Sequence, residues 1–293
     1  MNLQVLGTPE WIDFSRQLLQ NRWAMDLLRD LWRYRELSVK LASKDIKVRY
    51  KHPILGFLWA LLVPTSMILI LTFIFSVLLK VPNEGVPFVV YISTAMFPWT
   101  FFQLALGSSV TSVVDSGSLI KKVYFPRELI PLSIVLANLV NFVLSLALLV
   151  LALRFFDIAW SWRLILLPAI IVLHLTLTAG LALLVSALQV EFRDMKYIVE
   201  IGLVLWFYLV PVFYPLTIFQ LYPPPVVLLY LMNPMVGIVT FYRWALLPGY
   251  TTLLPIFISW TGLMGYTVIV SIAILMLGAS VFRRRQSVFA DWV

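Results

Sequence analysis

Long apolar runs, separated by short polar segments, make up most of the chain from residue 55 onward. A helix of about twenty apolar residues crosses the roughly 30 Å hydrocarbon core of a bilayer. Six runs approach or exceed that length, and they cover residues 55–79, 88–114, 131–153, 164–190, 197–214 and 256–282. The pattern therefore predicts an all-α membrane protein with six transmembrane helices in residues 55–282, followed by a short tail at residues 283–293.

The segment before the first span is basic and amphipathic. Apolar residues recur at helical spacing at Tyr34, Leu37, Leu41 and Val48, and basic residues are the commonest kind at the other positions up to residue 51. Helices of this composition lie on anionic membrane surfaces. The alternative is a solvated helix packed on a partner. We assign residues 1–54 to an N-terminal region that carries an amphipathic interfacial helix.

The segment between the fifth and sixth spans, residues 215–255, follows a different pattern. Eight of the seventeen prolines in the chain fall between residues 211 and 255. Two apolar pieces, residues 226–232 and 236–247, are too short to cross the bilayer. Such pieces are tolerated at membrane depth only where protein or a water-filled cavity covers their backbone. We therefore predict a pair of re-entrant half-helices.

The loop between the second and third spans, residues 116–130, carries more than a connection needs. Its centre holds Tyr124 and Phe125, and charged residues flank them on both sides. The flanking residues are Lys121, Lys122, Arg127 and Glu128. An aromatic tip inside a charged rim is typical of a protein docking surface. The alternative is an amphipathic segment that rests on the lipid, with its lysines extended toward water.

Composition and charge agree with a membrane protein. The 293 residues are 61% hydrophobic and 12% charged, whereas a soluble domain is about 25% charged. The net charge of +8 does not indicate nucleic-acid binding, because the basic residues lie beside the spans as topology signals. With both termini in the cytoplasm, the cytoplasmic segments hold eight Lys and Arg near the spans and the outer loops hold four. We therefore expect both termini, and the loop 116–130, on the cytoplasmic side.

Several kinds of chemistry are missing from the sequence. The chain has no cysteine, and no glycine is followed by lysine, so it holds neither a disulfide nor the phosphate-binding loop of a P-loop ATPase. Its two histidines, His52 and His174, form no metal-ligand cluster. His174 is the ionisable residue near the middle of a span, where a hydrogen-bonded histidine inside the bundle is favoured over a proton relay. We find no set of convergent acid and base groups for a membrane-embedded transferase or polymerase.

Aromatic residues are 15% of the chain, and many fall within the spans. Aromatic rings pack well against the apolar faces of sugar rings, so some of them are candidates to line a substrate path. The alternative is ordinary lipid-facing bulk and helix packing. The candidates are Trp59, Phe73, Phe97, Trp99, Phe102, Trp206 and Tyr208.

Five segments together resemble one family. They are Lys44–Lys51 running through Leu55, Gly56 and Trp59 to Pro64; Leu119–Pro126; Phe192–Tyr197; Asn233-Pro234; and Phe289-Ala290-Asp291. From about Arg35 to the C-terminus, the chain resembles the membrane subunit of ABC exporters of the ABC-2 type (type V). Its segments are similar in particular to those of the permeases that export O-antigen, capsule and teichoic acid polymers.

The resemblance implies a multi-pass homodimer in the bacterial cytoplasmic (inner) membrane, with two ABC ATPase subunits docked beneath it. The partner subunits, and not this chain, would bind ATP and Mg²⁺, so the chain would be a transport subunit and not an enzyme. The substrate would be a lipid-linked polysaccharide, and the dimer seam would form from the first and fifth spans. A coupling helix at residues 116–130, together with the loop 191–196, would contact the ATPase. The expected contact residues are Leu119, Lys121, Lys122, Tyr124, Phe125, Arg127, Glu128, Arg193 and Asp194.

The pyrophosphate of the lipid carrier would be guided by Lys47, Arg49 and Lys51, for which the alternative is anchoring to anionic lipid. Two other functions stay open at this point. One is an ABC-2 exporter of a small molecule or a simple lipid. The more distant one is a secondary transporter coupled to an ion.

Overall fold

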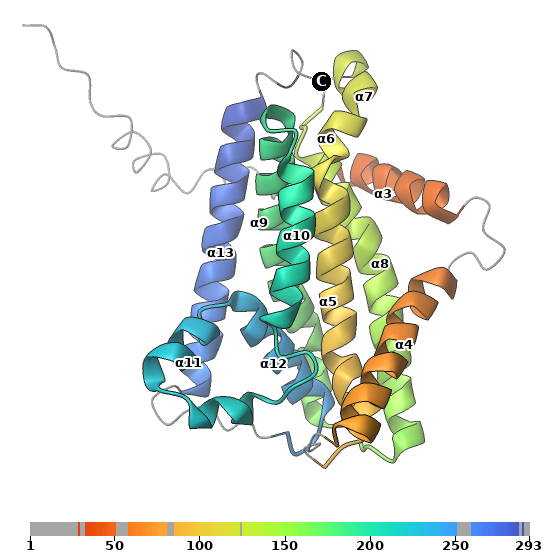
Figure 1. Ribbon diagram of the computed structural model, residues 1–293. Helices are drawn as coiled ribbons and strands as arrows, with labels where there is room; N and C mark the ends of the chain where they lie inside the picture. The colour runs from red at the N-terminus through yellow and green to blue at the C-terminus, as the bar shows by residue number, and fades with distance from the viewer. Residues whose placement is uncertain are drawn as a thin grey trace, which may run out of the picture.

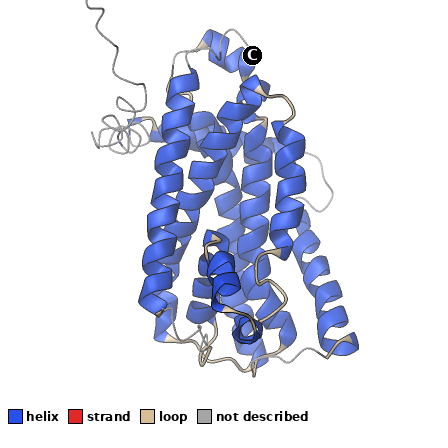
Figure 2. Cartoon of the chain, turned by 60° about the vertical axis from the view of Figure 1, so that its left-hand side comes forward, coloured by secondary structure: helices blue, strands red, loops and turns tan. Residues whose placement is uncertain are grey.

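The computed structural model describes residues 29, 33–50, 58–80, 85–123, 125–250, 259–286 and 289. Regular structure in these residues is helical (Figures 1 and 2). Several positions singled out by the sequence lie outside the described residues. These are Lys51, His52, Leu55, Gly56, Tyr124, Ala290, Asp291, the end of the predicted re-entrant segment at residues 251–255 and the start of the sixth predicted span at residues 256–258.

Among the described residues, five helices are long and apolar enough to cross a membrane. They are α4 (Leu58–Thr72) with the π-helical turn η1 (Phe73–Leu78), α5 (Phe88–Val110), α8 (Leu129–Ala152), α9 (Leu167–Glu191) and α13 (Trp260–Arg285). These correspond to the first four predicted spans and to the sixth. The all-α membrane fold predicted from the hydropathy pattern is confirmed.

The fifth predicted span, residues 197–214, differs from its expectation. Helix α10 (Met195–Tyr208) has 14 residues, which is about 21 Å of helix. The chain then continues without helix through Val210 and Val212, both fully buried. Pro211 and Pro215 explain the early end, because proline lacks an N–H and disfavours helical backbone at the residue before it.

The predicted half-helices are present. Helix α11 (Pro224–Leu231) follows the short 3-10 helix η4 (Leu216–Leu221), and it bends by 83° into α12 (Pro234–Leu246). Each half-helix begins with a proline in its first turn, where a missing N–H costs nothing. Figure 1 shows both near the end of the bundle at which α10 arrives and from which α13 leaves. The chain thus enters and leaves this pair on one side of the bundle.

The opposite end of the bundle carries two connections, one from α5 to α8 and one from α9 to α10 (Figure 1). Both connections hold motifs that the sequence singled out. Two short helices follow α5: α6 (Ser112–Asp115) comes just before the loop 116–130, and α7 (Gly117–Lys122) lies within it. Helix α3 (Arg35–Tyr50) lies across this end of the bundle and packs against α8. Two 3-10 helices, η2 (Leu153–Phe156) and η3 (Trp162–Leu166), form the connection at the other end.

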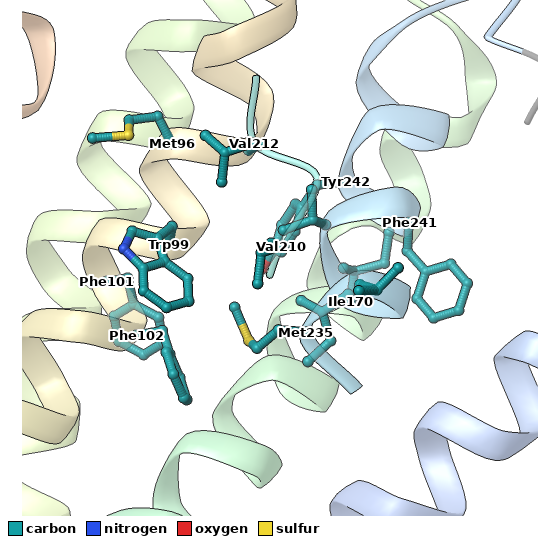
Figure 3. Packing of buried hydrophobic residues seen from close by; sticks show 14 of the residues in the cluster. Met96, Trp99, Phe101, Phe102, Ile170, Val210, Val212, Met235, Phe241 and Tyr242 are labelled. Carbon is teal, nitrogen blue, oxygen red and sulfur yellow. The ribbon is translucent and has the colours of Figure 1, made fainter. Parts of the chain in front are cut away.

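Two clusters of buried apolar side chains hold these elements together. The larger one lies inside the bundle around α5, which is the most buried of the five long helices. Figure 3 shows Trp99 and Phe102 of α5 facing Met235 and Tyr242 of α12, with Val210 and Val212 between them. The smaller cluster lies at the end that carries α3 and α7. The apolar residues of α3 that the sequence placed on one helical face, Tyr34, Leu37 and Leu41, pack against it.

Candidate functional site

A groove of about 910 Å³ runs between α4, α5 and α10. Four of its lining residues are aromatic: Trp59, Trp99, Phe207 and Tyr208. Five are polar and uncharged: Ser66, Thr100, Gln103, Ser108 and Asn141. The remaining lining residues are aliphatic, proline or methionine. The groove therefore offers flat apolar rings beside hydroxyl and amide groups.

The polar groups of the groove come mainly from one face of α5. Thr100, Leu104 and Ser108 recur every four residues, and Gln103 follows Thr100 by three, which places these lining residues on one side of the helix. The indole N–H of Trp99 donates to the Gln103 side-chain oxygen at 3.1 Å. This bond fixes the ring that forms the inner wall. Polar side chains on a membrane helix favour a groove that admits water or a hydroxyl-rich ligand.

The structure brings three of the seven sequence-predicted path residues to this groove, namely Trp59, Trp99 and Tyr208. Phe102 is fully buried and packs on Trp206 with ring centroids 5.2 Å apart. The Trp206 indole donates to Asn233 at 2.9 Å, which ties α10 to the start of α12. The other two residues, Phe73 and Phe97, do not line the groove either.

One groove residue, Phe207, is missing from the path residues predicted by sequence. The lining residues of α10 are Leu203, Val204, Phe207 and Tyr208. Leu203 and Phe207, and likewise Val204 and Tyr208, are four residues apart, so the four line one face of α10. Helical periodicity was the available signal.

The loops that carry the predicted ATPase contacts lie at the same end of the bundle (Figure 1). Lys121, Lys122, Arg193 and Asp194 are exposed, and Leu119 is partly buried against the smaller cluster. Two apolar residues are also exposed here, Val123 at 51% and Phe192 at 52%. Tyr124 lies outside the described residues. The described part of this surface is a set of charged residues around isolated apolar side chains.

Three of the predicted contact residues are buried or partly buried, so Phe125 and Glu128 are not part of the exposed tip and rim expected from sequence. Phe125 is 7% exposed and belongs to the smaller buried cluster. Glu128 is buried and accepts from Arg283 Nε at 2.8 Å, and Arg127 donates to the carbonyl oxygen of Gln286. The end of α13 covers this side of the loop, and sequence patterns do not report contacts between such distant segments.

Gln189, which the sequence gave no reason to single out, shapes the connection between α9 and α10. Its side-chain amide donates to the Arg193 carbonyl at 3.0 Å, and its side-chain oxygen accepts from the Lys196 backbone N–H at 2.7 Å. Both bonds close the turn that presents Arg193 and Asp194. A buried glutamine here fixes the orientation of an exposed loop.

The expected hydrogen bond of His174 is not present. The side chain is fully buried, and neither ring nitrogen has a partner among the described residues. Four aromatic rings surround it instead, with centroids 4.9–6.2 Å away: Phe101, Phe102, Phe142 and Tyr242. His174 packs as one more ring of the bundle core.

The surroundings of Arg243 also differ from the sequence prediction. Arg243 is one of the four basic residues that were counted in the outer loops. The side chain is fully buried within α12. Its guanidinium lies 3.9 Å from the centre of the Tyr91 ring and donates to the Val212 carbonyl at 2.7 Å. A cation above an aromatic face is stabilised by the ring. Arg243 therefore fastens the segment after α10 to α5 and α12.

The predicted carrier-binding residues are only partly described. Lys47 is exposed on α3, Arg49 lies in α3 with a side chain that is not described, and Lys51 is outside the described residues. Within the described part of the chain, no group of three metal-binding side chains comes together.

The chain is similar to known transport proteins. A family model described as ABC-2 type transporter matches residues 38–247. The chain is 34% identical over 267 residues to the O-antigen export system permease protein RfbA of Myxococcus xanthus, covering 90% of this chain and 98% of that protein. It is 29% identical to the RfbA permease of Klebsiella pneumoniae, covering 87% and 94% of the two chains. It is 24% identical to the polysialic acid transport protein KpsM of Escherichia coli, covering 84% and 92%.

These matches confirm the resemblance inferred from the sequence motifs, including the expectation of a transport subunit that lacks the nucleotide-binding domain. The family model spans α3 to α12 and therefore includes both the groove and the loops at the end of the bundle. The chain belongs to the ABC-2 type transporter family and is a multi-pass membrane permease subunit.

Proposed function

We propose that the chain is the membrane subunit of an ATP-driven exporter that moves a lipid-linked polysaccharide, of the O-antigen or capsule kind, out of the bacterial cytoplasm. The observation that carries this proposal is the groove between α4, α5 and α10, with aromatic rings beside amide and hydroxyl groups. Aromatic rings pack against the apolar faces of sugars, and the polar groups bond their hydroxyls. The relatives named for O-antigen and polysialic acid transport support this substrate class.

The groove is open on the side formed by α4 and α10. Both helices expose large apolar residues there, among them Val63, Ile70 and Leu205. A second copy of the chain placed on this face would close two grooves into one path, so we propose a homodimer with its seam at α4 and α10. The aromatic walls of the two copies would then face a common channel.

We propose that the end of the bundle with α3 and α7 faces the cytoplasm, so that both termini are cytoplasmic. The charges support this orientation, because Lys121, Lys122, Arg193 and the run Arg283–Arg285 all lie at that end. Two ATPase subunits would dock there on α7 and on the turn held by Gln189. They would bind ATP and Mg²⁺, which this chain has no loop to hold.

In the proposed cycle, ATP binding closes the partner subunits, and their motion moves α7 and the helices packed on it as rigid bodies. The pyrophosphate of the carrier would approach along α3, guided by Lys47, Arg49 and Lys51. The sugar chain would then pass along the groove. Helices α11 and α12 would cover the outer exit, with Arg243 holding them against α5.

The absence of cysteine from the chain makes the docking surface directly testable. We expect Val123→Cys to crosslink to a single cysteine on the docking surface of the ATPase from the same genome, with a yield that changes on adding nucleotide. Val123 is the exposed apolar residue at the end of α7. Trp162→Cys, 72% exposed at the other end of the bundle, is the matched control and should not crosslink.

A protein that is inserted and dimeric but gives no crosslink at residue 123 with any ATPase of that genome would contradict the proposal. An equal crosslink at residues 123 and 162 would contradict the orientation.

A further inference from the structure

The C-terminal end of α13 binds both of the connections that lie beside it. Arg283 Nε donates to Glu128 Oε1 at 2.8 Å, just before α8 begins. Arg127 donates to the Gln286 carbonyl, and Arg285 forms an ion pair with Glu191 at the end of α9. The arginines of this tail therefore do more than set the topology.

The two ion pairs differ in their surroundings. The side chains of Arg283 and Glu128 are 11% and 5% exposed, whereas those of Arg285 and Glu191 are 34% and 48% exposed. An exposed pair contributes little. In a buried pair, removal of one partner leaves the other charge stranded without water. The Arg283–Glu128 pair is thus the contact that a change in geometry would disturb most.

Apolar packing surrounds this pair and reaches α7. Phe282 of α13 is fully buried and packs edge-on against Phe289, with centroids 5.2 Å apart. Phe125 and Ile120, from the loop and from α7, belong to the same buried cluster. The end of α13 is therefore tied to the start of α8 by the ion pair, and it shares a buried cluster with α7 through Ile120 and with the loop through Phe125.

Helix α13 in turn moves with α9, because the two helices pack backbone to backbone. At Gly278 an added Cβ would collide with the backbone of Gly180, and at Gly180 it would collide with the backbone of Leu275. No side chain lies between the helices at this point to absorb a sliding motion. A displacement of α13 is therefore transmitted to α9.

We infer that Arg283 and Glu128 are positioning residues that hold the loop behind α7 to the end of α13, so that α7, α13 and α9 form one rigid unit and motion of a docked ATPase reaches the membrane helices. The inference deepens the proposed function and rests on it. Export requires the pair to persist through the cycle, because it ties the loop that follows α7, at the start of α8, to the closely packed helices α13 and α9.

The test uses the complex with its ATPase in liposomes, with a lipid-linked polysaccharide inside. We expect Glu128→Gln and Arg283→Gln to keep ATP hydrolysis and the nucleotide-sensitive crosslink at Val123→Cys. Polysaccharide exported per ATP should fall about tenfold, which is within the range for mutations in a coupling network. The exchange of charges, Glu128→Arg with Arg283→Glu, should recover much of the loss. Arg154→Gln, an exposed arginine at the other end, is the control and should export normally.

Unchanged export per ATP in both single variants would overturn the inference while leaving the proposed function intact. Loss of the crosslink in the parent complex would overturn the proposed function instead. Where the single variants fail to insert, Glu128→Cys with Arg283→Cys joined by a short bifunctional thiol reagent replaces the ion pair. Export by the joined protein supports a rigid unit, and a block that is relieved by cleaving the reagent overturns it.

Discussion

Two buried side chains, His174 and Arg243, show how the bundle treats polar groups at the residue scale. Both are fully buried. Arg243 keeps a hydrogen bond to Val212 and the face of Tyr91, whereas His174 is surrounded by rings and has no hydrogen bond among the described residues. Arg243 links α12 to α5 and to the segment after α10. His174 fills space as an aromatic ring, which argues against a site for a coupled ion.

Because His174 packs among four aromatic rings, two variants should behave differently. His174→Phe keeps a ring of similar size, so export should stay within about twofold of the parent and stability should fall by less than about 1.5 kcal/mol, as for volume-conserving exchanges. His174→Ala opens a cavity among four rings and should cost about 2–4 kcal/mol. Thermal unfolding in detergent and export in liposomes measure the two effects. Loss of export in a well-folded His174→Phe protein would show that an ionisable group is needed after all.

The sequence identified His174 and the charged loop 116–130 as unusual but could not give their partners. The rings around His174 come from α5, α8 and α12, and only the folded bundle brings them together. Glu128 meets Arg283 across 155 residues of chain. Composition predicts that a buried charge needs a partner, but it does not say which of several arginines supplies it. The sequence therefore located the motifs, but it did not predict the buried or partly buried contacts of Phe125, Arg127 and Glu128.

At the element scale, hydropathy located most of the spans because apolar length is the property that the bilayer selects. Five predicted spans coincide with helices to within a few residues. The remaining one, the fifth span, is shortened by Pro211 and Pro215. Hydropathy includes the apolar residues after Tyr208 in the span, but it takes no account of the prolines that end the helix there. The packing of helix against helix left no such signal, because a glycine in an apolar run gives no indication of which helix approaches it.

The contact between α9 and α13 gives a prediction about these glycines. Gly278→Ala places a Cβ against the backbone of Gly180, which cannot move aside as a side chain does. We expect it to destabilise the protein by about 2 kcal/mol or more, at or above the middle of the range for overpacked sites. Gly265→Ala, in the same helix but with nothing within 4 Å of the added Cβ, should leave stability equal or slightly raised.

Thermal unfolding of the purified protein in one detergent compares the two alanine variants under equal conditions. Equal melting temperatures would mean that α9 and α13 can separate without loss. The rigid unit inferred above would then lack its connection from α13 to α9.

At the scale of the whole molecule, the groove would be one half of a channel in the proposed homodimer. Its inner wall on α5 is fixed by the Trp99–Gln103 hydrogen bond, while its outer residues Trp59 and Tyr208 are 51% and 61% exposed. Exposed aromatic rings at the rim of a groove suit a path that two copies complete. They also suit a ligand that slides, because each ring contributes modestly and none binds the chain at a single place.

A sliding polymer and a small molecule predict different behaviour of the same variants. We expect Trp59→Ala and Tyr208→Ala to lower export about three- to tenfold, corresponding to the loss of one aromatic contact in each copy. Trp162→Ala, 72% exposed outside the groove, should export normally. The defect should grow with the length of the polysaccharide, because each added repeat unit must pass the missing ring. Measured with polymers of graded length, a defect independent of length would instead favour the exporter of a small molecule or simple lipid, whose passage uses each ring once.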